Sequence, residues 1–489
     1  TVPASVKKIG EYAFSECDDL TEVVLSEGLE TIEASAFYGC EGLAGLDLPD
    51  TLATIGDAAF RQCTGLADIS FGKGLKTVGG SAFYGCSGLE SLELPEGLES
   101  IGNSAFYQCT GMAGGLVIPA SVQVIGDRAF YGCTGLDGKL VIEGGEKSVG
   151  NYAFRDCSGL TGLELGEGIR SIGEYAFYDC TGLTGELELP EGIATIGSYA
   201  FFGCKDLSGE LVLPASLTGI GANAFYGCSG FTGELVVPDQ ITVLPYGVFG
   251  RMEGITSIII GTGVTTINTS SGSSHPFYGM SGVTEVTFTG LTVPELYHSG
   301  YGPFAPLSAL ETVYVPAGVY SEYSAAYKSY LPSGARMRSI GAEGDFQIDD
   351  GVLTVYLGDG GEVEIPDGVE EIGTSAFQNC SGLTKVTVPA SVKKIGEYAF
   401  SECDDLTEIV FAEGLETIGA NAFYGCESLA GLEFPDTLVS VGNAAFAQCT
   451  GLADISFGKG LKTVGENAFN GCSGLESLEL PEGLESIGY

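Results

Sequence analysis

The stretch FYGCSGLESLELPEGLESIGNSAFYQC, residues 83–109, contains one complete copy of a unit that recurs along the chain. From Cys86 to Cys109 the unit reads C-x-x-L-x-x-L-x-L-P-x-x-L-x-x-I-G-x-x-A-F-x-x-C. Its cysteines return every 23 or 24 residues within two runs, from Cys17 to Cys228 and from Cys380 to Cys472. A fixed period of this length is typical of a solenoid.

The pattern within the unit predicts how one turn folds. Alternation at Leu92–Leu94 predicts a short strand with Glu93 directed outward, and Pro95 ends it. Phe106 is expected to fill the centre of the turn, within a short helical or 3-10 turn formed by A-F-x-x-C. A single turn cannot bury its own apolar edge, so copies must stack with parallel strands and share one core. In turns with one extra residue, a Gly before the strand is expected to allow a bulge.

The unit resembles the leucine-rich repeats of BspA-like bacterial surface proteins, also called the Treponema pallidum type. A-F-x-x-C followed by L-x-x-L-x-L-P and L-x-x-I-G carries the resemblance over most of the chain. It implies a leucine-rich repeat solenoid, an extracellular location at the cell surface, and adhesion to host or bacterial proteins, such as those of the extracellular matrix. It implies no catalytic residue and no cofactor.

The composition agrees with a long apolar core and a strongly acidic surface. The 489 residues include 77 Gly, no Trp and 44% hydrophobic residues, and the formal net charge is -44. Such a charge repels nucleic acid and anionic lipid and favours basic partners or cations. No apolar run approaches the ~18 residues of a membrane-spanning helix. Both ends of the sequence fall inside repeats, so we expect that export signals and anchors lie outside it.

The 15 cysteines raise the question of disulfides. Successive cysteines would point the same way along the stack, their number is odd, and Met252, Met280 and Leu307 replace them in irregular turns. We therefore expect buried free thiols that act as small hydrophobic groups.

The repeats divide the chain into four expected segments. Residues 1–316 form a first array, 317–344 a closing helix and linker, 345–366 an entry hairpin, and 367–489 a second, truncated array. The second array copies residues 1–103 at an offset of 386. Two insertions near residues 268–301 contain the only histidines, His275 and His298, which without a third ligand give a weak metal signal.

One column of candidate binding residues directly follows the central Phe of each turn. Stacked turns would align these tyrosines into a row suited to sugar or peptide partners, unless each ring only covers the neighbouring turn. The candidates are Tyr84, Tyr107, Tyr131, Tyr178 and Tyr226.

A second candidate column lies on the predicted strands, where Glu186, Glu210 and Glu234 occupy equivalent places. Like charges on adjacent strands are unfavourable without compensation, so this strip would meet a cationic partner patch, bind calcium weakly, or remain solvated. The sequence contains none of the motifs G-x-S-x-G, H-E-x-x-H and G-x-x-x-x-G-K-[ST], which are typical of serine hydrolases, zinc proteases and nucleotide-binding proteins. We expect a non-enzymatic adhesion module; the alternatives are a carbohydrate-binding module that uses the tyrosines and a structural spacer.

Overall fold

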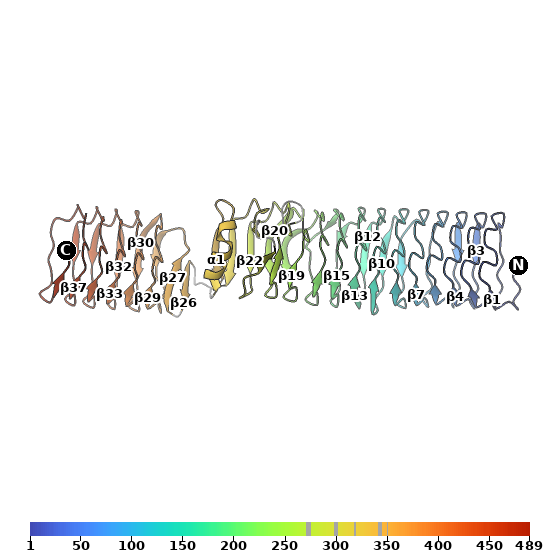
Figure 1. Ribbon diagram of the computed structural model, residues 1–489, viewed down its shortest axis with the longest axis horizontal. Coiled ribbons are helices and arrows are strands. Elements are labelled where there is room, and N and C mark those ends of the chain that lie inside the picture. The colour runs from blue at the N-terminus through green and yellow to red at the C-terminus, as the bar shows by residue number, and fades with distance from the viewer. Residues whose placement is uncertain (270–274, 298–301, 317–318, 341–344, 350) are drawn as a thin grey trace. The chain divides into compact units, whose positions relative to one another are not determined.

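The computed structural model describes residues 1–489 except 270–274, 298–301, 317–318, 341–344 and 350. The chain winds through successive turns that stack side by side (Figure 1), which confirms the predicted parallel-strand solenoid. It divides into two compact units. Unit 1 comprises Thr1–Val315 with Ser321–Met337, and unit 2 comprises Pro316–Tyr320 with Arg338–Tyr489.

The longest sheets run along the second apolar pair of each turn, the L-x-x-I-G segment. Each inner strand pairs with a strand on both sides; β7 (Ser100–Ile101) pairs with β6 (Thr77–Val78) before it and β9 (Val124–Ile125) after it. In unit 1 a ten-stranded sheet contains β1 (Lys8–Ile9), β2 (Thr31–Ile32), β4 (Thr54–Ile55), β6 (Thr77–Val78), β7, β9 (Val124–Ile125), β11 (Lys147–Val149), β13 (Ile169–Ile172), β15 (Thr195–Ile196) and β17 (Gly219–Ile220). A three-stranded sheet continues with β19 (Val243–Leu244), β21 (Thr266–Asn268) and β23 (Glu295–Tyr297). The corresponding eight-stranded sheet of unit 2 contains β26 (Phe346–Asp349), β27 (Val352–Tyr356), β29 (Glu371–Ile372), β31 (Lys394–Ile395), β33 (Thr417–Ile418), β35 (Ser440–Val441), β37 (Thr463–Val464) and β38 (Ser486–Ile487).

The L-x-L segments form several smaller sheets, whose outward side we call the strand face. In unit 1 these sheets are β3 (Gly45–Asp47) with β5 (Asp68–Ser70); β8 (Leu116–Ile118), β10 (Lys139–Ile142) and β12 (Gly162–Leu165); β14 (Gly185–Glu186) with β16 (Leu207–Ser208); and β18 (Thr232–Val237), β20 (Gly254–Ile260), β22 (Glu285–Phe288), β24 (Thr312–Pro316) and β25 (Arg336–Ile340), of which only residues 336 and 337 belong to unit 1. In unit 2 they are β28 (Gly361–Glu364), β30 (Leu383–Val388) and β32 (Glu408–Phe411), and β34 (Gly431–Glu433) with β36 (Asp454–Ser456).

The prediction of a strand at Leu92–Leu94 is therefore wrong for that turn. Leu92 is buried and Glu93 is exposed, as expected, but residues 91–94 form no ladder. The continuous ladder lies instead at Ser100–Ile101, where backbone bonds such as Gly102 N–H to Val78 O (2.8 Å) hold neighbouring turns.

A column of stacked phenylalanines fills the core, as predicted. The rings of Phe106, Phe130 and Phe154 are fully buried, and their centroids lie 5.1 and 5.2 Å apart with nearly parallel planes. The column runs from Phe14 to Phe249 in unit 1, and a second one runs from Phe377 to Phe469 in unit 2. Each ring packs on those of the neighbouring turns, so the core is continuous within each unit.

The A-F-x-x-C segments form tight turns rather than the predicted helical turns. In the turn around Phe106, the residues Ser104 and Gln108 have φ of 57° and 54°. These left-handed conformations cost roughly 1 kcal/mol each for non-glycine residues. They direct every second N–H toward the next turn: Phe106 N–H donates to Ala129 O (2.7 Å) and Gln108 N–H to Tyr131 O (2.7 Å). A helix would keep those bonds local, whereas this ribbon uses them to join turns.

All 15 cysteines are free thiols, and twelve of them are buried. Each of the latter donates to the carbonyl of the phenylalanine one turn earlier, as in Cys157 Sγ to Phe130 O at 3.1 Å. Burial raises the pKa of Cys63 to about 12, which keeps that thiol protonated at neutral pH. The expectation of buried free thiols is confirmed for these positions, whereas Cys17 is exposed and Cys380 and Cys472 are half-buried.

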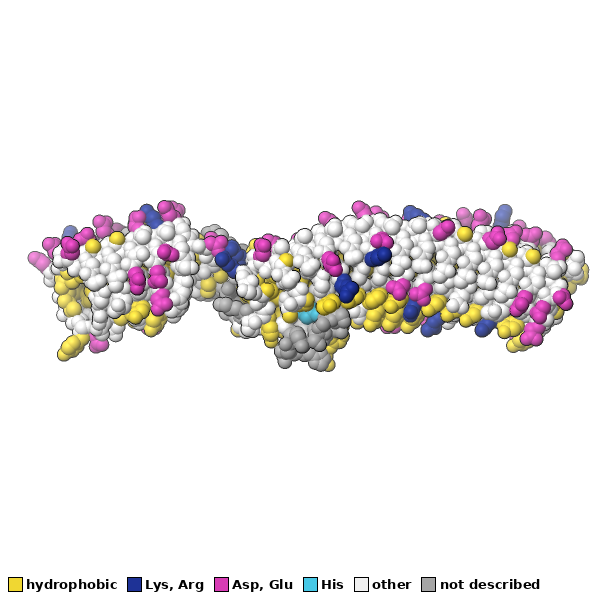
Figure 2. Space-filling model, turned by 90° about the horizontal axis from the view of Figure 1, so that it is seen from above, with side chains coloured by type: hydrophobic (Ala, Val, Ile, Leu, Met, Phe, Trp, Pro, Cys, Tyr) yellow, Lys and Arg dark blue, Asp and Glu magenta, His cyan; other side chains and the backbone are white. Residues whose placement is uncertain are grey.

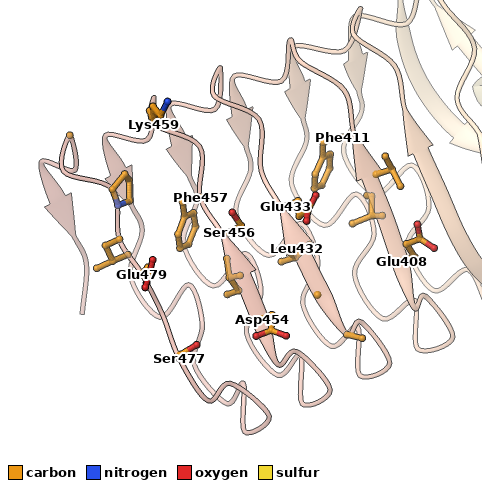
Figure 3. A pocket seen from close by; sticks show the side chains of 18 of the residues that line it. Glu408, Phe411, Leu432, Glu433, Asp454, Ser456, Phe457, Lys459, Ser477 and Glu479 are labelled. Atoms are coloured by element: carbon orange, nitrogen blue, oxygen red, sulfur yellow. The ribbon is translucent and has the colours of Figure 1, made fainter.

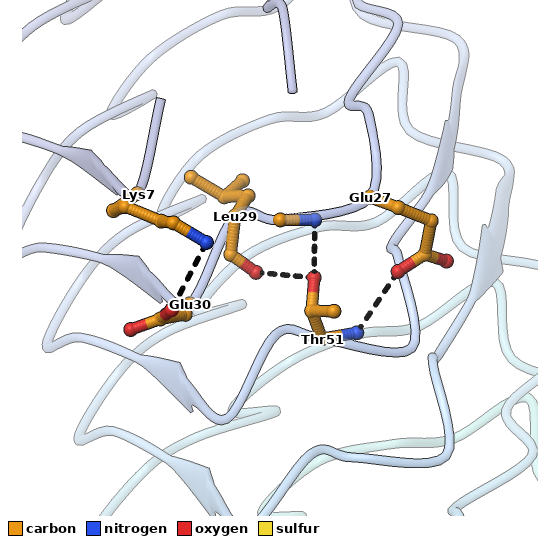
Figure 4. A network of polar contacts seen from close by, with 6 residues as sticks. Lys7, Glu27, Leu29, Glu30 and Thr51 are labelled. Atoms are coloured by element: carbon orange, nitrogen blue, oxygen red, sulfur yellow. Dashed lines mark hydrogen bonds and ion pairs between the residues drawn. The ribbon is translucent and has the colours of Figure 1, made fainter. Parts of the chain in front are cut away.

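Side chains in the loop after each L-x-L segment also join consecutive turns (Figure 4). Thr51 Oγ1 accepts from Gly28 N–H (2.8 Å) and donates to Leu29 O (2.9 Å), and Glu27 Oε2 accepts from Thr51 N–H (3.3 Å). Glu27 Oε1 also accepts from Asp50 N–H (3.0 Å). In the following turn Asp50 Oδ1 accepts from Lys73 N–H (2.9 Å). These bonds fix the loops beside the strand face.

The last turns of unit 1 are closed by α1 (Tyr320–Tyr327) and a 3-10 turn, η3 (Lys328–Tyr330). Tyr323 is buried against Phe288 (5.1 Å between centroids) and donates to Gly290 O (3.0 Å). Tyr327 is buried and donates to Pro294 O. The helix therefore packs against the last turns of unit 1, and its role as a closing element stays a prediction. The stretch expected to be a linker contains a strand, β25, which adds to the sheet beside β24.

Unit 2 begins with the predicted hairpin. Strands β26 and β27 are antiparallel, and β27 then pairs in parallel with β29. The hairpin thus starts the sheet of the second stack, while position 350 in its turn lies outside the described residues. Within the described part of the chain, no helix is long and apolar enough to cross a membrane.

Candidate functional site

The predicted tyrosines form two stacked runs on the A-F-x-x-C edge of unit 1. Tyr84, Tyr107 and Tyr131 stack with centroid separations of 4.6 and 4.8 Å. Tyr178 and Tyr226 stack on opposite faces of Phe202, at 4.9 and 5.2 Å. All are half-buried. We call this row the tyrosine column.

Arginines continue the tyrosine column where the sequence lacks an aromatic residue. Arg155 occupies the place between Tyr131 and Tyr178, and its guanidinium carbon lies 5.6 and 4.5 Å from their ring centroids. Arg61 lies 4.4 Å from the centroid of Tyr84. Each cation over a ring contributes about 0.5–1 kcal/mol at such sites. The ring faces are therefore occupied by neighbouring side chains.

A second aromatic row, which the sequence analysis missed, lies beside the first. Tyr152, Tyr175 and Tyr199 stack at 4.7 Å, and the guanidinium of Arg128 lies 4.7 Å from the centroid of Tyr152. The signal was present as a Tyr two residues before the central Phe in N-Y-A-F, E-Y-A-F and S-Y-A-F. Burial raises the pKa of Tyr175, so it stays neutral well above physiological pH.

These two rows offer edges rather than faces to a ligand. Figure 2 shows hydrophobic side chains in a band along one edge of unit 1, interrupted by cationic and acidic groups. Stacking on a sugar ring needs an uncovered aromatic face, and such faces are used here within the rows. Hydroxyl groups and ring edges remain available for hydrogen bonds and lateral contacts.

The predicted glutamates are exposed on the strand face. Each follows a glycine in a left-handed conformation, with φ between 83° and 86° at Gly185, Gly209 and Gly233. The register shifts between Gly233 and Glu234, which is the bulge expected from the extra residue.

The structure brings the three glutamates into one column. The stem of Glu186 lies over Gly209, where an added Cβ would be 2.9 Å from its Cγ, and Glu210 lies over Gly233 in the same way. Glu234 accepts a bond from Ser257 Oγ at 3.3 Å. Within the described residues, these three carboxylates form no ion pair, whereas nearby Glu164 pairs with Lys139. The column therefore carries uncompensated negative charge.

No metal centre is formed by the residues that the structure describes, since they contain no group of three or more His, Cys, Asp or Glu that could hold an ion. His275 is buried; its Nδ1 accepts from Phe277 N–H (3.2 Å), so Nε2 donates to Gly302 O (3.2 Å). Burial lowers the pKa of His275 to about 4. It therefore acts as a neutral bridge between turns, and His298 lies outside the described residues.

The family model described as BspA type Leucine rich repeat region matches six copies in this chain. The matches cover residues 1–113, 114–228, 184–295, 209–330, 361–430 and 393–489. A search of curated proteins gives no match.

Among solved structures, the chain is similar to a leucine-rich repeat protein from Bacteroides ovatus, with 24% identity over 94% of this chain and 85% of that one and a TM-score of 0.37. The Treponema pallidum leucine-rich repeat protein shares 36% identity over 28% of this chain and 73% of its own, with a TM-score of 0.26. A leucine-rich cell surface protein from Faecalibacterium prausnitzii shares 20% identity over 96% of this chain and 85% of its own, with a TM-score of 0.26.

Proposed function

Because the chain belongs to the BspA-type leucine-rich repeat family, we propose that it is a non-enzymatic module that binds protein partners at a cell surface through its strand face. The column of Glu186, Glu210 and Glu234 is the observation that carries this proposal. Three exposed carboxylates on neighbouring turns, without ion pairs in the described structure, repel one another. A cationic partner patch would remove that repulsion and gain affinity and rate from charge complementarity.

The partner is a basic protein surface rather than a nucleic acid or anionic membrane. The net charge of -44 repels both of the latter at long range. The strand face adds a local reason, since its outward carboxylates concentrate negative charge on one side of the turns.

The carbohydrate alternative rests on the tyrosine column, and its ring faces are covered by neighbouring rings and guanidinium groups. The spacer alternative predicts no binding at all. The strand face therefore supports protein binding better than either alternative.

The test is a charge reversal on the strand face. Glu186→Lys, Glu210→Lys and Glu234→Lys together should weaken binding to immobilised lysozyme, used as a basic protein probe, by at least tenfold at low salt. The matched control changes the net charge equally with Glu41→Lys, Asp206→Lys and Glu253→Lys, which are exposed in the turns that follow the Cys position. Equal loss in both variants would reduce the effect to net charge and overturn the proposal.

A second arm separates the alternatives. We expect the unmodified chain to give no signal on a glycan array, and a triple Tyr107→Ala, Tyr131→Ala, Tyr178→Ala variant to keep its affinity for lysozyme. Glycan binding that this variant abolishes would replace the protein partner by a carbohydrate.

A further inference from the structure

A groove is hollowed in the strand face of unit 2 (Figure 3). It has a volume of about 1150 Å³, slightly above the ~300–1,000 Å³ typical of ligand sites. Carboxylates project from successive strands around it, and partly exposed apolar side chains lie among them. The residues that define it are Glu408, Glu433, Asp454, Glu479, Phe457 and Leu480.

Unit 1 carries the same groove at an offset of 386 residues. Its volume is about 790 Å³, and it is defined by Asp47, Asp68, Glu93, Phe71 and Leu94. Four of these have the identical residue in unit 2, and Asp47 corresponds to Glu433, which keeps the charge. The two units therefore share these five positions, whereas the groove of unit 2 extends one turn further, to Glu408, which pairs with Lys385 at 3.0 Å.

The backbone is paired differently on the two sides of this turn. Gly72, directly after Phe71, lies so close to the preceding turn that an added Cβ would be 2.2 Å from Pro49 O. Strand β5 pairs with β3 in the preceding turn, but it has no paired strand in the following turn, at residues 91–94. Gly458 lies equally close to Pro435 O in unit 2, beside the paired β34 and β36. In unit 1 the following segment, residues 91–94, is left without a ladder, whereas its copy in unit 2 keeps one parallel bridge, between Ser456 and Glu479.

The segment on the far side of the groove has unused backbone groups. Within the described structure, residues 91–94 make no backbone–backbone hydrogen bond. An extended peptide that lies across the strand face can direct alternate side chains into the groove. The groove thus suits an extended chain better than a helix.

The geometry points to two equivalent docking sites, one on each unit, for an extended partner segment that alternates basic and apolar residues. Basic side chains would meet Asp68 and Glu93 or their copies Asp454 and Glu479, and apolar side chains would cover Phe71 or Phe457. Charge complementarity selects this occupant, because the acidic groups outnumber the single lysine at each groove, Lys73 or Lys459. The inference rests on the proposed function and adds the partner's conformation and the number of sites.

The difference between the copies supports the grooves as the shared feature. From residue 64 to 102, the copy at 450–488 changes only Gly80 to Glu466, Ser81 to Asn467 and Tyr84 to Asn470. All three lie on the A-F-x-x-C edge. The tyrosine column is thus interrupted in unit 2, while the groove is complete in both units.

The test uses the full chain and a synthetic peptide of about eight residues that alternates Lys and Val, titrated by calorimetry. We expect two equivalent sites per chain, with affinity that falls as salt is raised. Asp68→Lys with Glu93→Lys should leave one site, Asp454→Lys with Glu479→Lys should also leave one, and the four changes together should leave none. A matched control, Glu41→Lys with Glu427→Lys, changes copy-related exposed residues away from the groove and should keep two.

Peptide controls test the chemistry of the groove. A Glu/Val peptide should not bind, and a Lys/Ser peptide should bind at least tenfold more weakly than Lys/Val because it lacks the apolar contacts. Equal affinity of the two Lys peptides, or a stoichiometry that the groove variants do not change, would overturn the inference. If the Lys/Val peptide fails while lysozyme still binds in a Glu186-dependent manner, the grooves are excluded and the proposed function stands.

Discussion

Residues 1–102 and 387–488 are two copies of the same turns, and they differ according to the side of the turn. On the strand side the changes keep the chemistry, as in Val23 to Ile409 and Asp47 to Glu433. On the A-F-x-x-C edge they alter it, as in Arg61 to Ala447 and Tyr84 to Asn470. The fold tolerates a different surface on that edge, whereas the strand face carries the same acidic and apolar groups twice.

The backbone still limits what the changing edge accepts. Ser35 and Ser81 have φ of 52° and 54°, and both become asparagine in the second copy, at Asn421 and Asn467. Asparagine adopts the left-handed conformation more readily than most residues. Side chains on this edge therefore change while the backbone of the turn does not.

The largest expected effect compares equivalent rings of the two phenylalanine columns. Phe83 is fully buried and stacks on Phe60 and Phe106, so Phe83→Ala should cost about 3–5 kcal/mol. Phe469 is half-buried and stacks on Phe446 alone, so Phe469→Ala should cost about 1–3 kcal/mol. Denaturation followed by tyrosine fluorescence measures both, since the chain has no Trp. If the two substitutions lowered the free energy of unfolding equally, the stability of each ring could not depend on packing against both neighbouring turns.

The second prediction contrasts the units by pH. Burial lowers the pKa of His275 to about 4 from its ordinary value near 6.5, so the unfolded chain binds more protons between these values. Unit 1 should therefore lose stability as pH falls from about 6.5 to 4, by about 3 kcal/mol in total. Unit 2 contains no histidine, so it should show no loss of stability from histidine protonation over this pH range. Amide exchange at pH 7 and 5 separates the units; a His275→Gln variant whose unit 1 kept the same pH dependence would refute the assignment.

The third prediction transfers the surface of one copy to the other. Arg61→Ala and Tyr84→Asn give unit 1 the residues of unit 2 and remove one cation over a ring and one stacked pair. Together they should cost about 1–2 kcal/mol. Thermal denaturation measures the change. A loss as large as that of Phe83→Ala would mean that the tyrosine column supports the turns rather than covering them.

The smallest expected effect is a gain that should be equal in both copies. Gln62 and Gln448 both have φ of 64°, where Gly39 and Gly85 stand in neighbouring turns with φ of 72° and 73°. Gln62→Gly and Gln448→Gly should each stabilise by up to about 1 kcal/mol because glycine adopts this conformation without a steric penalty. Chemical denaturation of each variant checks the gain, and destabilisation by either change would contradict it.

The features that depend on repeated side chains were predictable from the sequence. The phenylalanine columns, the buried thiols, the closing helix and the entry hairpin each follow from a residue that recurs or from a local signal. The continuous ladder at Ser100–Ile101 was not, because a two-residue strand has no alternation to detect. The groove was not predictable either, since no feature of the repeated unit indicates that the ladder of β3 and β5 stops before residues 91–94.

The candidate site was predictable in part for the same reason. Columns of Tyr and Glu follow from the period, and the structure aligns both. The arginines that cover the rings could not be predicted, because their positions depend on side-chain conformations. Lys147 could not be placed either. It is buried at a position that leucine or isoleucine occupies in other turns, next to a register shift in β11 that the sequence does not indicate.

Amide hydrogen exchange of the full chain with and without the Lys/Val peptide distinguishes the two sides of the turn most directly. Residues 91–94 and their copies at 477–480, apart from the bridged Glu479, should exchange fast in the free chain and become protected in the complex, together with β5 and β36. The A-F-x-x-C edge, including residues 104–109 and 152–157, should not change. Protection confined to that edge would show that the strand face is not the binding surface.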